Sequence, residues 1–223
     1  MNDFIDNFAN VDTLLEVWPL LLSGLKITAL LCLVTVPAGA ALGLAVAVLH
    51  SLRIRGIGAL VILYVDLLRS FPPLVLLILI YYGLPFLGLE LGELAAAGLA
   101  LVLNSSAYYG EIFRAGIEAV PRGQREAARS TGLGAGQAML YVVLPQAIKA
   151  VIPPLTSNTL ELVKLTSIAS VVALPELLRS ARLAQDLVYN PTPLMAAALI
   201  YFLALWPLVR LISALDRRAM ASR

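Results

Sequence analysis

The sequence is poor in the residues that build metal centres, disulfides and catalytic groupings. It has one cysteine, Cys32, and one histidine, His50, among 223 residues. A single cysteine excludes an internal disulfide, and one histidine with one cysteine supplies too few ligands for a zinc or iron site. The same scarcity leaves little from which a Ser/His/Asp grouping could be built. We therefore expect no metal, no cofactor and no catalytic role for this chain.

Charge is scarce as well, because 13% of the residues are charged and 60% are hydrophobic. Soluble domains are roughly half apolar and a quarter charged, so this composition indicates an integral membrane protein embedded in a lipid bilayer. The net charge of +2 is too small to indicate a nucleic-acid partner. A G-x-x-x-x-G-K-[ST] phosphate loop is missing from the sequence. The chain by itself should neither bind nor hydrolyse ATP.

Long apolar runs predict an all-α, polytopic membrane protein with about five transmembrane helices. Each run reaches the roughly 20 residues needed to cross a bilayer, and the runs cover residues 19–49, 58–85, 92–117, 141–171 and 191–214. Pro72-Pro73 and Pro153-Pro154 interrupt the second and fourth runs. These pairs either kink the helices or act as flexing points for alternating access, and the sequence does not separate the two.

The distribution of lysine and arginine between the predicted loops sets the orientation. Arg53 and Arg55 follow the first run, and Arg217, Arg218 and Arg223 follow the last. The positive-inside rule makes these segments cytoplasmic and places the N-terminus outside. We expect three parts, namely an extracytoplasmic segment 1–18, a transmembrane domain 19–214 and a cytoplasmic tail 215–223.

A charged stretch, GQREAARSTGLG at residues 123–134, stands between two apolar runs. It predicts a short helix after Pro121, with Gly132 permitting a left-handed stop and Gly134 and Gly136 keeping the next turn loose. No face of this helix is apolar enough to be buried against its own domain. The alternative to a helix covered by a partner is a helix that lies at the membrane interface, or a solvated loop.

The charged stretch also carries a family resemblance. Glu126-Ala127-Ala128, then Gly132, then Val142-Val143-Leu144-Pro145 resemble the EAA signature of permease subunits in binding-protein-dependent ABC importers. From Ala107 to Leu177 the chain resembles the polar amino acid subfamily almost without a gap, and the likeness covers about residues 19–214. One departure is Lys164-Leu165-Thr166-Ser167, where the subfamily usually has Lys-Asp-Thr-Ser; another is Arg69-Ser70-Phe71-Pro72, where it usually has Arg-Gly-Thr-Pro.

The resemblance implies a type I ABC importer permease of the bacterial inner membrane, which moves a polar amino acid by alternating access. Its coupling helix, at about residues 123–135, would dock on a cytoplasmic ATPase, with the contact residues Gln124, Glu126, Ala127, Ala128 and Gly132. Implied partners are two ATP-binding subunits, an extracytoplasmic substrate-binding protein and a second permease, identical or paralogous. ATP would be bound by the ATPase subunits. A self-contained secondary transporter or channel is the alternative, although such proteins usually show more spans or an internal repeat.

Ionisable residues inside the predicted spans are candidates for a substrate path. Asp66 with Arg69, and Glu161 with Lys164, lie three residues apart and either neutralise each other or serve transport. In the resembled subfamily the third and fourth spans line the path. The predicted pocket, able to bond both ends of a zwitterion, therefore comprises Asn104, Glu161, Lys164, Thr166 and Ser167.

Overall fold

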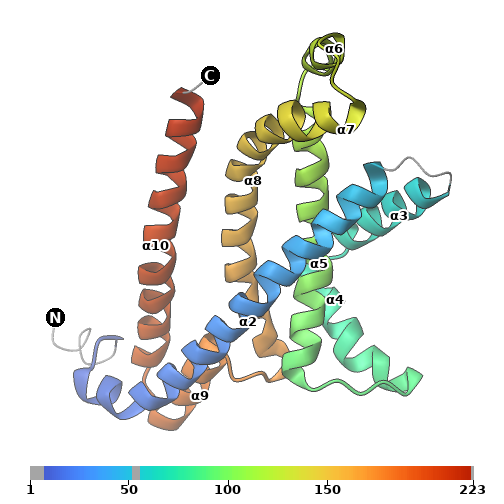
Figure 1. Ribbon diagram of the computed structural model, residues 1–223. Helices are drawn as coiled ribbons and strands as arrows, with labels where there is room; N and C mark the ends of the chain where they lie inside the picture. Colours follow the sequence, from blue (N-terminus) through green and yellow to red (C-terminus); the bar gives the residue numbers. More distant parts are fainter. Residues whose placement is uncertain (1–7, 52–55, 222–223) are drawn as a thin grey trace. The chain divides into compact units, whose positions relative to one another are not determined.

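The computed structural model describes residues 8–51 and 56–221, with side chains described except at positions 211, 212 and 215–221. All regular elements in these ranges are helical, in agreement with the predicted all-α class (Figure 1). The arginine side chains after the first and last runs, on which the predicted orientation depends, lie outside the described residues.

The first described helix, α2, runs from Val11 to Ser51. It begins earlier than the predicted residue 19, because the Asn10 Oδ1 atom accepts a hydrogen bond from the Thr13 N–H at 3.0 Å and caps the helix. Pro19 and Pro37 are accommodated inside it. The last part of the predicted extracytoplasmic segment is therefore helical.

The two proline pairs behave differently. Helix α3 (Ile57–Ser70) ends before Phe71 and Pro72, which are extended at ψ 129° and 133°, and α4 (Pro73–Ile78) starts a new helix. The second pair was predicted to interrupt a helix, and that prediction is wrong, because Pro153 and Pro154 lie inside α8 (Leu144–Leu165). The Thr156 hydroxyl lies 2.9 Å from the Ile152 oxygen and 2.8 Å from the Pro153 oxygen. The carbonyls that lose their helical N–H partner to the two prolines lie four residues earlier, at Lys149 and Ala150.

The remaining elements follow in chain order. They are η1 (Leu79–Gly83), η2 (Leu84–Leu87), α5 (Glu93–Glu118), α6 (Arg122–Ser130), α7 (Ala135–Ala138), η3 (Met139–Val143), η4 (Thr166–Val172), α9 (Leu177–Val188) and α10 (Thr192–Ala221). The helix α9 was not predicted.

Three described helical stretches are long and apolar enough to cross a membrane, and they are Val11–Ser51, Ala135–Val172 and Thr192–Arg210. The broken pair Ile57–Ser70 with Pro73–Leu87 makes a fourth if it counts as one span. The third predicted span, 92–117, corresponds to α5, which is long enough at 26 residues but less apolar than the other spans. It is more polar because it carries charged residues at both ends and a run of Asn104, Ser105 and Ser106.

The chain divides into two compact units, and the boundaries cut through α2, α5 and α8. The first unit comprises three segments of the chain, which are Met1–Pro37, Pro72–Val102 and Leu160–Arg210. Its apolar core joins the start of α2 to α9 and α10, and the buried residues are Val17, Leu21, Leu177, Ala181, Ala184 and Ala197. Figure 1 shows α9 lying beside the first turns of α10.

The second unit comprises Ala38–Phe71, Leu103–Thr159 and the residues from Leu211 onward. Here α2 and α5 meet at Gly43, where an added Cβ would lie 2.6 Å from the Tyr109 Cβ and 2.8 Å from the Ser106 carbonyl oxygen. Only glycine permits helices to approach so closely. This glycine of the first run therefore serves packing within the chain.

Candidate functional site: an exposed helix and a polar cavity

The short charged helix is present as α6, Arg122–Ser130, in the second unit. Figure 1 shows it beyond the end of α5 and next to α7. Gly132 follows it with φ of +89°, which fulfils the predicted left-handed stop. The predicted loose turn after it is wrong, because α7 begins at Ala135 and the Gln137 side chain accepts a hydrogen bond from the Gly134 N–H at 2.9 Å.

The surface of α6 is open to its surroundings. Ala128 faces inward and is buried, while Gln124, Glu126 and Ala127 are exposed, as is Gly132. Of the residues predicted to contact an ATPase, four are therefore accessible and Ala128 is a packing residue. The exposed face carries Glu126 next to Arg122 and Arg129, so a partner would meet charges of both signs.

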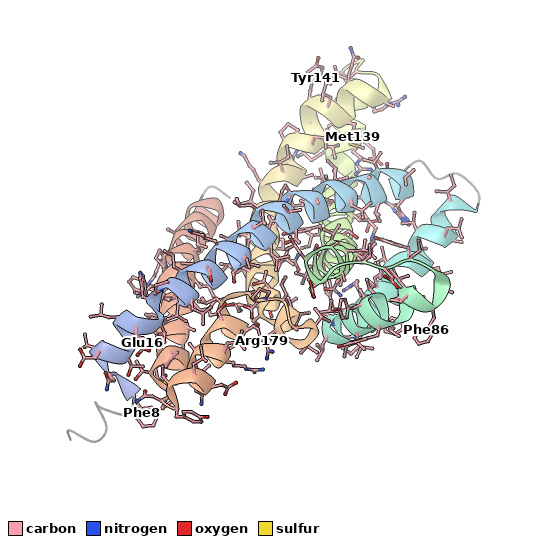
Figure 2. The ribbon with its side chains drawn as sticks, turned by 90° about the horizontal axis from the view of Figure 1, so that it is seen from below. Phe8, Glu16, Phe86, Met139, Tyr141 and Arg179 are labelled. Carbon is pink, nitrogen blue, oxygen red and sulfur yellow. The ribbon has the colours of Figure 1, made fainter. Side chains whose placement is uncertain are left out.

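A small apolar cluster beneath α6 supports it. Val120, Val143 and Ala147 are buried together, with Ile117 and Met139 packed against them. Figure 2 labels Met139 and Tyr141, both from η3. Tyr141, at 65% exposure, lies outside the cluster. The end of α5, the start of α8 and η3 thus form the platform that carries the helix.

The first unit contains a cavity of about 360 Å³ between the end of α8, η4 and α10. Two predicted substrate residues, Lys164 and Ser167, line it together with Tyr201. The other lining residues are apolar, and they are Leu178, Leu194, Ala197, Ala198 and Leu205. The volume suits a small organic molecule with one polar end.

The predicted pair Glu161 and Lys164 is formed. The Lys164 Nζ lies 2.8 Å from the Glu161 carboxylate, and both side chains are more than half exposed. The chain itself therefore leaves both charges accessible to a ligand.

Thr166 and Asn104 have structural partners. Thr166 is fully buried, and its hydroxyl donates to the Val163 carbonyl at 2.7 Å. Asn104 belongs to the second unit, is 3% exposed, and donates from Nδ2 to the Leu68 carbonyl at 3.3 Å. The structure thus places Lys164 and Ser167 at the cavity, with Glu161 outside its lining but paired to Lys164, and uses the other two in packing contacts.

The other predicted pair is not formed. No ion pair joins Asp66 to Arg69, although the structure describes both, and the Arg69 guanidinium instead lies 5.3 Å from the centroid of the Tyr108 ring. Arg114 binds Glu111 at 2.9 Å and Glu118 at 2.6 Å. Asp66 lines a second cavity of about 290 Å³ with His50 and Arg114, in the second unit.

Sequence reasoning missed Glu176 and Tyr201. Glu176 is fully buried and caps α9, with its carboxylate accepting hydrogen bonds from the N–H groups of Leu178 and Arg179 at 3.0 and 2.7 Å. The Tyr201 hydroxyl donates to the same carboxylate at 3.0 Å. The signal that could have found the cap is an acidic residue directly after Pro175 and before an amphipathic stretch.

Comparison with known proteins extends the observations on α6. Residues 39–220 match the family described as binding-protein-dependent transport system inner membrane component. The chain is 40% identical to the probable glutamine ABC transporter permease protein GlnM of Bacillus subtilis (strain 168), over 90% of each chain. It is 35% identical to the arginine transport system permease protein ArtQ of the same organism, over 90% of this chain and 92% of that one.

Solved structures agree with these matches. The crystal structure of an amino acid ABC transporter with histidines superposes with a TM-score of 0.87 at 38% identity, covering 92% of this chain and 96% of that one. An inward-facing MetNI methionine ABC transporter shares the fold, with a TM-score of 0.72 at 22% identity over 93% of this chain and 98% of that one.

These findings support the importer hypothesis rather than the self-contained transporter or channel. The family match covers most of the chain and includes α6 with its EAA residues. ATP hydrolysis in such importers belongs to separate subunits, and the family name places the protein in the inner membrane. The chain therefore belongs to the family of binding-protein-dependent inner membrane transport components, as the non-catalytic permease subunit of an ABC importer.

Proposed function

We propose that this permease carries a polar amino acid such as glutamine or arginine across the inner membrane. The observation that supports this most directly is its similarity to glutamine and arginine permeases over 90% of the chain. A zwitterion cannot cross roughly 30 Å of hydrocarbon unaided, so the path needs polar groups. The cavity in the first unit offers such groups at one end.

The proposed substrate contacts are Glu161, Lys164 and Ser167. Lys164 would bind the substrate carboxylate with help from the Ser167 hydroxyl, and Glu161 would attract the ammonium group. Their 2.8 Å pair would open as the substrate enters, with the substrate's carboxylate and ammonium groups replacing each partner. A substrate contact by Asn104 or Thr166 stays a prediction. The Asn104 amide already donates to the Leu68 carbonyl, and the Thr166 hydroxyl already donates to the Val163 carbonyl.

We further propose that α6 is the coupling helix. ATP-driven closure of two ATPase subunits would pull two copies of α6 together, one from each of two permeases. The exposed Gln124, Glu126, Ala127 and Gly132 supply the contact surface, and Ala128 fixes the helix on its platform. The dimer is either a homodimer or a heterodimer. In this arrangement the N-terminus lies outside and the C-terminus in the cytoplasm, and the substrate-binding protein delivers from outside.

Reconstitution tests the transport function. The permease, its ATPase and its binding protein are placed in proteoliposomes, and uptake of labelled glutamine, arginine and cystine is followed with ATP inside or outside. We expect uptake of at least one of them only when ATP faces the ATPase, and loss of uptake in Lys164→Met.

The matched control is Lys26→Met, which removes a lysine of the first unit that does not line the cavity. Uptake without ATP would point to a self-contained transporter. Uptake that Lys164→Met leaves unchanged would exclude this cavity as the substrate site.

A further inference from the structure

Glu176 is a fully buried carboxylate that transport, as described above, does not use. It lies between α9 and those parts of α2 and α10 that belong to the first unit. Its two oxygens satisfy the first N–H groups of α9, which is an ordinary role for a helix cap. A buried charge is costly, however, and an Asn or Ser cap would supply the same bonds without it. The carboxylate therefore calls for a second role.

The third hydrogen bond of the carboxylate indicates that role. The Tyr201 hydroxyl lies 3.0 Å from Glu176 Oε2. The hydroxyl has one proton to donate, and this bond uses it. The hydroxyls of Thr28 and Thr166 donate their own protons to the Gly24 and Val163 carbonyls. The described bond that holds the tip of the tyrosine is therefore the one to Glu176.

The rest of Tyr201 lines the cavity that holds Lys164 and Ser167. Because its tip is fixed, the ring offers an aromatic surface facing the space between these polar groups and Leu178, Leu194 and Leu205. A tyrosine side chain has two rotatable angles, so one bond at its tip determines where the ring lies. The shape of the cavity wall therefore depends on the carboxylate behind it.

The backbone around Glu176 is itself fixed. The next residue, Leu177, donates its N–H to the Thr28 hydroxyl of α2 at 3.0 Å, and Ser180 donates its N–H to the Glu176 carbonyl at 2.8 Å. The carboxylate can thus act as a rigid anchor, because the main chain that carries it bonds to α2 on one side and continues into α9 on the other.

We propose that Glu176 is a positioning residue for transport, which sets the substrate affinity of the cavity by holding the ring of Tyr201 in the cavity wall. The inference rests on the proposed function of this cavity. The apolar part of the amino acid lies against the ring, while its charged groups bind at Lys164 and Ser167. Glu176 does not touch the substrate.

The test compares Tyr201→Phe, Glu176→Gln and the double variant in the reconstituted importer, measuring KM and maximal uptake rate for the amino acid that the wild type carries. Tyr201→Phe keeps the ring and removes the hydroxyl, so we expect KM to rise about fivefold, the equivalent of one hydrogen bond, with the maximal rate within about twofold. Glu176→Gln should raise KM less, because the amide oxygen still accepts from the Arg179 N–H and the amide NH2 can donate to the phenol oxygen, while the Leu178 N–H loses its acceptor.

The double variant should have the KM of Tyr201→Phe alone, because both changes act through one bond. The control is Tyr189→Phe, which removes a hydroxyl from a residue that is 94% exposed and lies between α9 and α10. An unchanged KM in Tyr201→Phe, or additive effects in the double variant, overturns the proposal. The proposal is also overturned if Tyr201→Phe lowers the thermal stability and the maximal uptake rate but leaves KM unchanged, because that is the result expected of a purely structural bond. A wild type without ATP-dependent amino-acid uptake would instead disprove the proposed function.

Discussion

Arg125 of α6 donates a hydrogen bond from Nη2 to the main-chain carbonyl of Ile117, at 2.9 Å. Ile117 lies in the last turn of α5, where carbonyl groups have no partner within the helix. The bond satisfies one of these groups and ties the exposed helix to the span before it. Together with the burial of Ala128, this bond helps to hold α6 on the second unit.

Replacing Arg125 should loosen α6 without unfolding the protein. In Arg125→Ala we expect the amides of α6 to exchange hydrogen about fivefold faster, because a bond worth about 1 kcal/mol is lost. Hydrogen exchange followed by mass spectrometry measures this on the permease alone. Arg129→Ala removes an exposed arginine from the same helix and should leave the exchange rates unchanged. Equal rates in all three proteins would show that Ala128 packing alone holds α6.

The contact surface of α6 can be tested by co-purification with the ATPase. Glu126→Arg reverses an exposed charge, and we expect at least tenfold weaker retention of the ATPase with normal folding of the permease. Glu90→Arg makes the same change at an exposed loop position and should have no effect. Retention that is equal in both variants would contradict the assignment of α6 as the coupling helix.

Gly132 should resist substitution for a backbone reason. Its φ of +89° is costly for any residue with a Cβ, so Gly132→Ala should shift the exit of α6 and weaken ATPase retention. Gly123 has open space around it and an ordinary φ. Gly123→Ala should therefore be tolerated, and equal losses in the two variants would refute this explanation.

The packing of α2 on α5 predicts a sharp difference between two glycines. Gly43→Ala places a methyl group 2.6 Å from the Tyr109 Cβ and 2.8 Å from backbone atoms, and we expect it to lower stability by about 1–3 kcal/mol. Gly98→Ala, in α5, meets nothing within 4 Å and should be neutral or slightly stabilising. Thermal unfolding in detergent compares the two, and similar melting temperatures would contradict the close approach.

Glu176 should also affect the pH dependence of stability. Burial raises the pKa of its carboxyl group above the ordinary value, so the folded protein holds this proton more tightly than the unfolded chain does. The contribution of this group is then most favourable at low pH and is lost as pH rises from the ordinary glutamate pKa through the raised one. We expect the melting temperature of the wild type to fall over this window more than that of Glu176→Gln, measured in detergent. Parallel curves would show that the raised pKa is absent.

The sequence predicted the elements that depend on local chemistry. The apolar runs and the charged stretch predicted most of the helices, including α6. The spacing of Glu161 and Lys164 predicted their pair, although the same spacing does not pair Asp66 with Arg69. The errors have physical causes. Asn10 extends α2 toward the N-terminus because of its cap, and Pro153-Pro154 lies inside α8, where each ring removes only one N–H from the helical hydrogen bonds.

What the sequence could not predict are contacts between distant parts of the chain. The bond from Tyr201 to Glu176 joins two elements whose meeting depends on the packing of the first unit. Asn104 likewise has the residue type of a substrate contact, yet its amide bonds to the Leu68 carbonyl. A polar residue in a membrane helix therefore needs its partner identified before its role can be assigned.

The close contact at Gly43 also constrains how the protein is made. The groove that Gly43 leaves on α2 is filled by Tyr109 and the Ser106 carbonyl of α5, and both are synthesised long after α2 leaves the ribosome. During that interval α2 resides in the bilayer with an unfilled notch, which lipid chains or the insertion machinery must occupy.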